Sequence, residues 1–113
     1  MQKKILIIGG TGFIGYHLAV RCKKLNWEIV SVSTKKPNKK RRLKKVKYKI
    51  CDIGIRKNLA KIAKYKYDYV VNLGGYVDHI NKIRTYRSHY LGAKNLFKVF
   101  KNKKLESFIQ IGS

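Results

Sequence analysis

The sequence predicts an α/β fold, a doubly wound parallel sheet of about five strands with helices on both faces. Three observations lead to this prediction. Short apolar runs rich in β-branched residues, typical of strands, alternate with segments of helical periodicity. Strands and helices that alternate along a chain form parallel sheets with right-handed crossovers. A glycine-rich turn also separates the first strand from the first helix.

The first half of the chain contains three predicted strands and one predicted helix. Residues 5–8 are a continuous apolar run before glycines, as in a strand buried on both faces. A helix should follow and end near Asn26, because one apolar stripe recurs at helical spacing: Ile14, Leu18, Cys22 and Leu25. Residues 29–33 and 46–51 read as the second and third strands, with a basic loop containing Pro37 between them.

The second half continues the alternation. Residues 55–63 predict a short helix, and residues 69–73 a fourth strand. The longest helix, 83–100, carries one apolar stripe, Ile83, Tyr86, Tyr90, Ala93, Phe97 and Phe100. Residues 108–111 are the fifth strand, which gives the sheet order 3-2-1-4-5 and a ligand crevice between strands one and four. Because no segment supplies a helix to cover strand five, we expect residues 1–113 to be one domain truncated from a longer protein.

The composition is strongly basic, with 28 Lys and Arg against 5 Asp and Glu, a formal net charge of +23. Such a balance raises the question of nucleic acid. The lysines are spread over every predicted element, however, so we expect at most nonspecific binding. No apolar run is long enough for a membrane helix. Cys22 and Cys51 lie far apart in unrelated contexts, and we expect buried thiols in a reducing cytoplasm.

The glycine-rich turn is the clearest candidate site. Its residues stand between a predicted strand and a predicted helix and are Gly9, Gly10, Thr11, Gly12, Phe13, Ile14 and Gly15. Glycines there permit a tight turn, close approach of the backbone to phosphate, and close packing of helix and strand. The N-terminus of the helix offers free N–H groups and a partial positive charge. The turn therefore predicts a Rossmann-type site for the pyrophosphate of a dinucleotide.

These motifs resemble the N-terminal part of an extended short-chain dehydrogenase/reductase, the NAD-dependent epimerase/dehydratase family that acts on nucleotide sugars. The glycines of residues 9–15 match the family's GxxGxxG motif. Cys51-Asp52-Ile53 matches the segment whose Asp contacts adenine, and Asn72-Leu73-Gly74-Gly75 matches a small-residue turn near the cofactor. Residues 90–96 are similar to the helix motif Asn-x-x-Gly-x-x-Asn-Leu, although His89 replaces its first Asn.

The resemblance implies an NAD(P)-dependent epimerase, dehydratase or reductase with a nucleotide-sugar substrate, in the cytoplasm. It adds cofactor contacts at Asp52, Ile53, Leu73, Gly74 and Gly75, and it makes Ser113 the catalytic Ser/Thr at the end of strand five. The family's catalytic Tyr-x-x-x-Lys follows that residue, so we expect this chain alone to be inactive.

The segment Tyr90 to Lys94 also spells Tyr-x-x-x-Lys, but it precedes Ser113 and lies in the apolar stripe of the predicted helix. It is interpreted as core or interface. In the resembled family this helix often forms a dimer interface, so the helix of residues 83–100 could pack in the core or in a homodimer.

The end of the second strand bears on the choice between NAD and NADP. NAD-selective sites usually place a carboxylate there. This chain has Ser33 at that position, followed by Lys35 and Lys36, and has no Asp or Glu between Glu28 and Asp52. A hydroxyl and cations attract a 2′-phosphate, which favours NADP(H).

The basic run of residues 39–45 leaves three interpretations open: a solvated loop, a patch for nucleic acid, or part of the 2′-phosphate contact. A non-catalytic NAD(P)-binding regulator remains the alternative function. His17, His79 and His89 show no metal-ligand spacing with the cysteines or acids, so no metal site is expected. His17 is interpreted as helix packing, and Asp78-His79 as a candidate lining of the substrate pocket.

Overall fold

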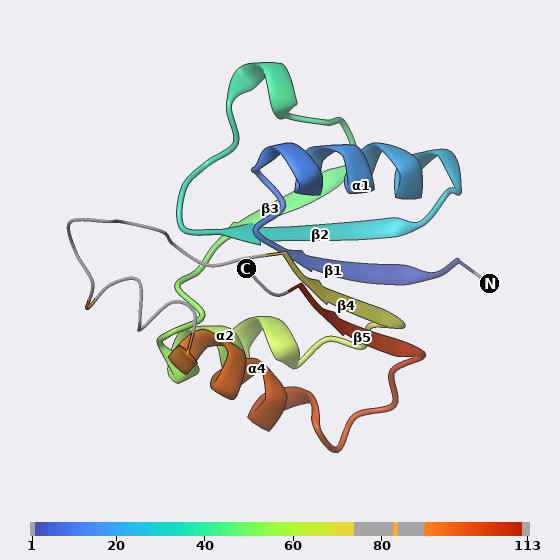
Figure 1. The fold of residues 1–113 in the computed structure, drawn as a ribbon. Coiled ribbons are helices and arrows are strands. Elements are labelled where there is room, and N and C mark those ends of the chain that lie inside the picture. The colour runs from blue at the N-terminus through green and yellow to red at the C-terminus, as the bar shows by residue number, and fades with distance from the viewer. Residues whose placement is uncertain (1, 74–82, 84–89, 112–113) are drawn as a thin grey trace.

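The computed structural model describes residues 2–73, 83 and 90–111. These residues form a parallel sheet in the order β3-β2-β1-β4-β5, which confirms the predicted topology (Figure 1). The strands are β1 (Lys4–Ile8), β2 (Glu28–Ser33), β3 (Val46–Ile50), β4 (Tyr69–Asn72) and β5 (Ser107–Gln110). The helices are α1 (Phe13–Lys24), α2 (Arg56–Ala63), α4 (Gly92–Phe100) and the short 3-10 helix η1 (Lys39–Arg41).

The sheet separates two apolar cores. Helix α1 covers one face, and α2 and α4 cover the other (Figure 1). Successive strand residues point to opposite faces, so the continuous apolar run of β1 supplies both cores. On the α1 face, Ile5, Ile7, Ile29 and Val71 pack with Ala19 and Cys22. On the other face, β1, β2 and β4 pack against α2 and α4 through residues that include Leu6, Val30, Val70, Leu59 and Leu96.

Helix α1 is where it was predicted, but only the middle of its predicted stripe, Leu18 and Cys22, packs on the sheet. The predicted stripe is wrong at its two ends, since Ile14 is 61% exposed and Leu25 52% exposed. The buried residues are the small ones, Gly15, Ala19 and Cys22. Small side chains let the helix axis approach the sheet closely, and that contact outweighs the burial of larger residues on the neighbouring face. The helix ends as predicted, with Asn26 in the left-handed conformation at φ 60°.

Helix α4 is also rotated relative to its predicted stripe. It buries Gly92, Leu96 and Phe100, whereas Phe97 is 65% exposed. Ile83 and Tyr90, from the same predicted stripe, are 81% and 52% exposed. The interpretation of this stripe as wholly core is therefore wrong for these three residues, and Tyr86 lies outside the described residues. The rotation follows from the close contact that Gly92 makes with the loop after β3, described below.

Both cysteines are buried free thiols, as expected. Burial raises the pKa of each thiol above its usual value, for Cys51 to about 11 with a further contribution from neighbouring Asp52. The thiols are therefore protonated at neutral pH and poor nucleophiles. Within residues 2–73 and 90–111, no helix has the length and apolar character needed to span a bilayer.

Candidate functional site

The candidate site lies where the parallel strands end. The carboxyl ends of β1, β2 and β3 meet at one edge, next to the glycine turn and the N-terminus of α1 (Figure 1). Backbone hydrogen bonds continue the sheet beyond the strands and fix this edge. The Gly9 N–H donates to the carbonyl of Val32 at 2.7 Å, and the Leu73 N–H donates to that of Ile8 at 2.9 Å. The turn is thus attached to the end of β2 and the segment after β4 to the end of β1, so both lie at this edge of the sheet.

Three glycines of the turn are required by the fold itself. Gly9 has a φ of 82°, a conformation that favours glycine. A Cβ on Gly15 would lie 2.5 Å from the Cα of Gly10 and 2.7 Å from the carbonyl oxygen of Gly9. A Cβ on Gly10 would lie 2.0 Å from the Oγ of Ser31 in β2. These three positions let the turn fold tightly over the sheet and let α1 pack against the turn.

Gly12 differs from the other three. A Cβ added there would meet only the carbonyl oxygen of Gly9 at 3.6 Å, an ordinary van der Waals distance. The fold therefore has room for a side chain at the start of α1. A glycine that packing does not require is the residue expected where a ligand approaches the backbone.

The N-terminus of α1 is suited to an anion. No side chain caps the helix, and its first turn contains no acidic residue. Its free N–H groups and the helix dipole would therefore face a ligand beside Gly12. Phe13 and Ile14, exposed at 65% and 61%, flank this position with apolar surface. His17 lies on the next turn with its ring edge-on to Phe13 and Tyr16, in agreement with a packing role.

Ser33 ties the end of β2 to the glycine turn. Its Oγ accepts hydrogen bonds from the Oγ1 of Thr11 at 2.9 Å and from the Thr11 N–H at 3.3 Å. The turn is thereby held over β2 by a hydroxyl at the position where NAD-selective sites usually carry a carboxylate.

A cavity of about 200 Å³ opens beside Ser33, between β2, β3 and the basic loop. Its lining consists of Thr11, Ser31, Lys35, Lys36, Pro37, Arg42, Tyr48, Lys49 and Ile50. Four of these side chains are cationic and none is acidic. Lys35 and Lys36 were expected here, whereas Ser31, Tyr48 and Lys49 were not. Strand alternation could have indicated two of them, because Ser31 and Tyr48 are register partners on the face that bears Ser33.

The loop after β3 is held in place by α4. The Asp52 carboxylate accepts a hydrogen bond from the Gly54 N–H at 2.8 Å, which makes a compact turn. The side-chain amide of Asn95 donates to the carbonyl of Ile53 at 2.9 Å. A Cβ on Gly92 would lie 2.6 Å from the Cδ1 of Ile53. The Gly and Asn of the helix motif thus support the segment predicted to contact adenine.

Ile53 itself lies in the core. Its side chain is 6% exposed and packs on the α2 and α4 face of the sheet. A contact between Ile53 and a cofactor would therefore use its backbone. Other predicted site residues lie outside the described part of the chain: Gly74, Gly75, Asp78, His79, His89 and Ser113. Among the described residues, no three His, Cys, Asp or Glu side chains are grouped as metal ligands would be.

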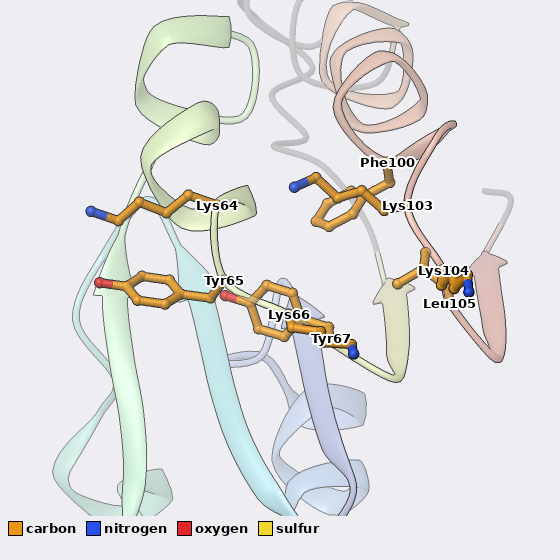
Figure 2. Close-up of a pocket in the computed structure, with 8 residues that line it drawn as sticks. All are labelled: Lys64, Tyr65, Lys66, Tyr67, Phe100, Lys103, Lys104 and Leu105. Atoms are coloured by element: carbon orange, nitrogen blue, oxygen red, sulfur yellow. The ribbon is translucent and has the colours of Figure 1, made fainter.

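A second hollow, of about 270 Å³, lies at the opposite edge of the sheet (Figure 2). It is lined by Lys64, Tyr65, Lys66, Tyr67, Phe100, Lys103, Lys104 and Leu105. Its polar groups have structural explanations. The Tyr67 hydroxyl donates to the carbonyl of Ile62 at 2.9 Å. The lysines follow the C-termini of α2 and α4, where cations complement the helix dipole. This hollow is not a candidate site.

Solved structures of known proteins share this fold. An epimerase from Methanothermobacter thermautotrophicus superposes with a TM-score of 0.86 at 18% identity, covering 96% of this chain and 34% of that one. The enzyme WbmF from Bordetella bronchiseptica, in complex with NAD+, has a TM-score of 0.80 at 21% identity, covering 96% and 36%. Uronate dehydrogenase from Agrobacterium tumefaciens has a TM-score of 0.80 at 17% identity, covering 99% and 41%.

At these identities the likeness shows the fold alone, and the chain spans only 34% to 41% of the length of these three proteins. No curated protein sequence matches it. A family model does match, over residues 5–113, and that model describes the NAD dependent epimerase/dehydratase family. The match covers both the glycine turn and the Gly92–Asn95 motif that supports the edge of the sheet. The chain therefore belongs to the NAD-dependent epimerase/dehydratase family.

Proposed function

We propose that residues 1–113 are the dinucleotide-binding portion of an NAD(P)-dependent enzyme that acts on a nucleotide sugar. One observation carries this proposal. The N-terminus of α1 has no side-chain cap, and the residue before it is Gly12, where the fold itself would leave room for a side chain. The pyrophosphate would lie against residues 9–15, with the adenosine toward Ser33 and Asp52 and the nicotinamide toward Leu73, Gly74 and Gly75.

The bound cofactor would supply a nicotinamide ring that gives or takes a hydride. The role of this chain is to bind and orient it. Ser113 is proposed to hydrogen-bond the reacting oxygen of the substrate, as its family counterpart does. Support for a nucleotide-sugar substrate comes from WbmF, which was also solved with NAD+ and UDP. Epimerase, dehydratase and reductase all fit the residues present.

The family's catalytic Tyr and Lys would follow Ser113, so the 113-residue chain should bind cofactor without turnover. When the chain is incubated with UDP-glucose and either NADPH or NAD+, neither the sugar nucleotide nor the cofactor should be converted. Turnover of a sugar nucleotide by this chain would contradict the assignment of residues 1–113 as a binding portion.

The test of the binding site is Gly12→Val. Its side chain would project into the space that the pyrophosphate needs, while meeting only ordinary contacts in the protein. We expect NADPH affinity, measured by fluorescence titration, to fall by a factor of about ten or more. The unfolding free energy should fall by about 1 kcal/mol or less, the cost of a β-branched residue at a helix N-cap. Unchanged NADPH binding would refute the site.

We also propose that NADP(H) is preferred over NAD(H). Support comes from the Ser33 hydroxyl in place of a carboxylate, and from the cations of the adjacent cavity, among them Lys35 and Lys36. NADPH should bind roughly tenfold more tightly than NADH, in line with one or two charge-assisted contacts. Equal affinities, or tighter NADH, would assign the site to NAD, the cofactor named by the family and bound in WbmF.

Finally, we propose a homodimer through exposed apolar residues of the helix that the sequence predicts over residues 83–100. Ile83, Tyr90 and Phe97 are separated by seven residues each, the spacing of one helical stripe, and all three are exposed. Apolar side chains of this size at heptad spacing are typical of a helix that packs against another helix.

A further inference from the structure

Within the dinucleotide site proposed above, on which this step rests, we infer that Arg42 recognises the 2′-phosphate of NADP(H). Ser31 supplies a buried hydroxyl to the same cavity, and Tyr48 is the positioning residue that holds Arg42 over it. The basic run of residues 39–45 then contains one ligand-binding side chain, supported by β3, among cations that do not line the cavity.

The first observation is a polar atom without a partner. Ser31 is 1% exposed, and its Oγ is the one buried side-chain nitrogen or oxygen among the described residues that lacks a hydrogen bond. Ser31 also lines the cavity beside Ser33. Buried hydroxyls are almost always hydrogen-bonded, and those that are not commonly mark the place of a ligand or ordered water. A phosphate oxygen, or a water bound to it, would accept the hydrogen bond that the Ser31 hydroxyl can donate.

The second observation is that hydrogen bonds fix the loop at the residues on either side of Arg42. The Leu43 N–H donates to the Tyr48 hydroxyl at 2.8 Å, and that hydroxyl faces the carbonyl of Arg41 at 3.4 Å. The Leu43 side chain packs against the core on the α1 face. One phenol on β3 therefore anchors the residues on either side of Arg42.

The third observation concerns the guanidinium itself. It lies 5.5 Å from the centre of the Tyr48 ring, a cation–π distance that orients its plane. None of the ion pairs among the described residues involves Arg42. Because none of the described residues that line the cavity is acidic, the N–H groups of the guanidinium are available to an external anion. A planar fork recognises phosphate by paired hydrogen bonds, whereas Lys35 and Lys36 act as point charges.

The test uses two ligands that differ only in the 2′-phosphate, 2′,5′-ADP (adenosine 2′,5′-bisphosphate) and 5′-AMP, with binding measured by calorimetry. Arg42→Ala should weaken the binding of 2′,5′-ADP by a factor of about ten and change the affinity for 5′-AMP by less than about twofold. Lys44→Ala is the matched control, because it removes an exposed charge from the same loop but does not line the cavity. It should change neither affinity.

Tyr48→Phe separates positioning from binding. It removes the hydroxyl that anchors Arg41 and Leu43 but keeps the ring under Arg42, so the affinity for 2′,5′-ADP should fall by about threefold while the affinity for 5′-AMP does not change. If the affinity for both ligands falls by the same factor, the role of Tyr48 is merely structural, and its assignment as the positioning residue for Arg42 is overturned. Thermal melting of each variant verifies that the fold is retained.

Other outcomes separate this inference from the proposed function. Wild-type protein that binds both ligands equally would overturn the 2′-phosphate site while leaving a dinucleotide site intact. If Arg42→Ala keeps the selectivity and a Lys35→Ala/Lys36→Ala double variant loses it, the recognition belongs to those lysines and the role of Arg42 is refuted. Failure of the wild type to bind any of NADPH, NADH, 2′,5′-ADP and 5′-AMP would refute the proposed function itself.

Discussion

Two serines of β2 should respond to truncation with opposite signs. Ser31 and Ser33 are two residues apart and point to the same face of the sheet. Ser33 Oγ accepts two hydrogen bonds from Thr11, whereas Ser31 Oγ is buried without a partner. Alanine in place of each serine removes a hydroxyl from the same face of one strand, where one hydroxyl is hydrogen-bonded and the other, more deeply buried, is not.

The magnitudes follow from the two environments. A buried hydroxyl with no partner costs about 1–3 kcal/mol relative to water. Ser31→Ala removes this cost but loses the packing of one atom against Gly10, so we expect the unfolding free energy to rise by about 1 kcal/mol. Ser33→Ala loses its bonds to the turn and leaves the Thr11 hydroxyl without that partner, so we expect a fall of about 1–2 kcal/mol.

The assay is urea unfolding of the cofactor-free protein, followed by circular dichroism, with a common slope for the three proteins. The two midpoints should lie on opposite sides of the wild-type midpoint. If Ser31→Ala is destabilised as much as Ser33→Ala, the Ser31 hydroxyl has a partner in the free protein, and the reasoning that links it to a ligand fails. With 2′,5′-ADP present, the advantage of Ser31→Ala should shrink, because the ligand binds more tightly to the protein that retains the hydroxyl and therefore stabilises it more.

Three further predictions concern the packing, the surface and the buried thiols. Gly92→Ala should lower the unfolding free energy by about 1–3 kcal/mol, because its Cβ would stand 2.6 Å from Ile53; a midpoint in urea equal to wild type would contradict the contact. Phe97→Asp, at a side chain 65% exposed, should leave thermal stability nearly unchanged but shift a dimer to monomer in sedimentation; a wild-type protein that stays monomeric at high concentration removes the dimer proposal. The pKa of the Cys51 thiol is raised from 9.0 to about 11 on folding, so its contribution to stability is present below pH 9 and is lost between pH 9 and 11. Urea midpoints at pH 8 and pH 10.5 should therefore differ more for wild type than for Cys51→Ala, and equal differences would show that other groups cause the alkaline loss.

The sequence alone was sufficient for the order of elements and for the glycine turn. Both depend on short-range patterns. The apolar run of residues 5–8, followed by glycines, is typical of a strand buried on both faces, and the alternation of strands and helices with right-handed crossovers favours the order 3-2-1-4-5. Gly9, Gly12 and Gly15 stand at a strand-to-helix junction, where a turn of this kind has few alternatives.

The tertiary structure decided which faces of the helices are buried. Helical periodicity identifies apolar positions, but it does not show how closely a helix approaches its neighbour. Helix α1 docks through Gly15 and Ala19, and α4 docks through Gly92 against Ile53, because the absence of side-chain atoms there allows the closest contact. Several larger residues of the predicted stripes, among them Ile14 and Phe97, lie at the surface as a consequence.

The cavity beside Ser33 also depended on the tertiary structure. Ser31, Arg42 and Tyr48 come from two strands and a loop, and no spacing along the chain relates them. They meet because the register of β2 and β3 places Ser31 opposite Tyr48, whose hydroxyl then draws the loop over the sheet. Hydrogen-bond register is set by contacts between strands that are distant in sequence, so a local pattern of residues could reveal the basic run but not the one arginine that β3 supports.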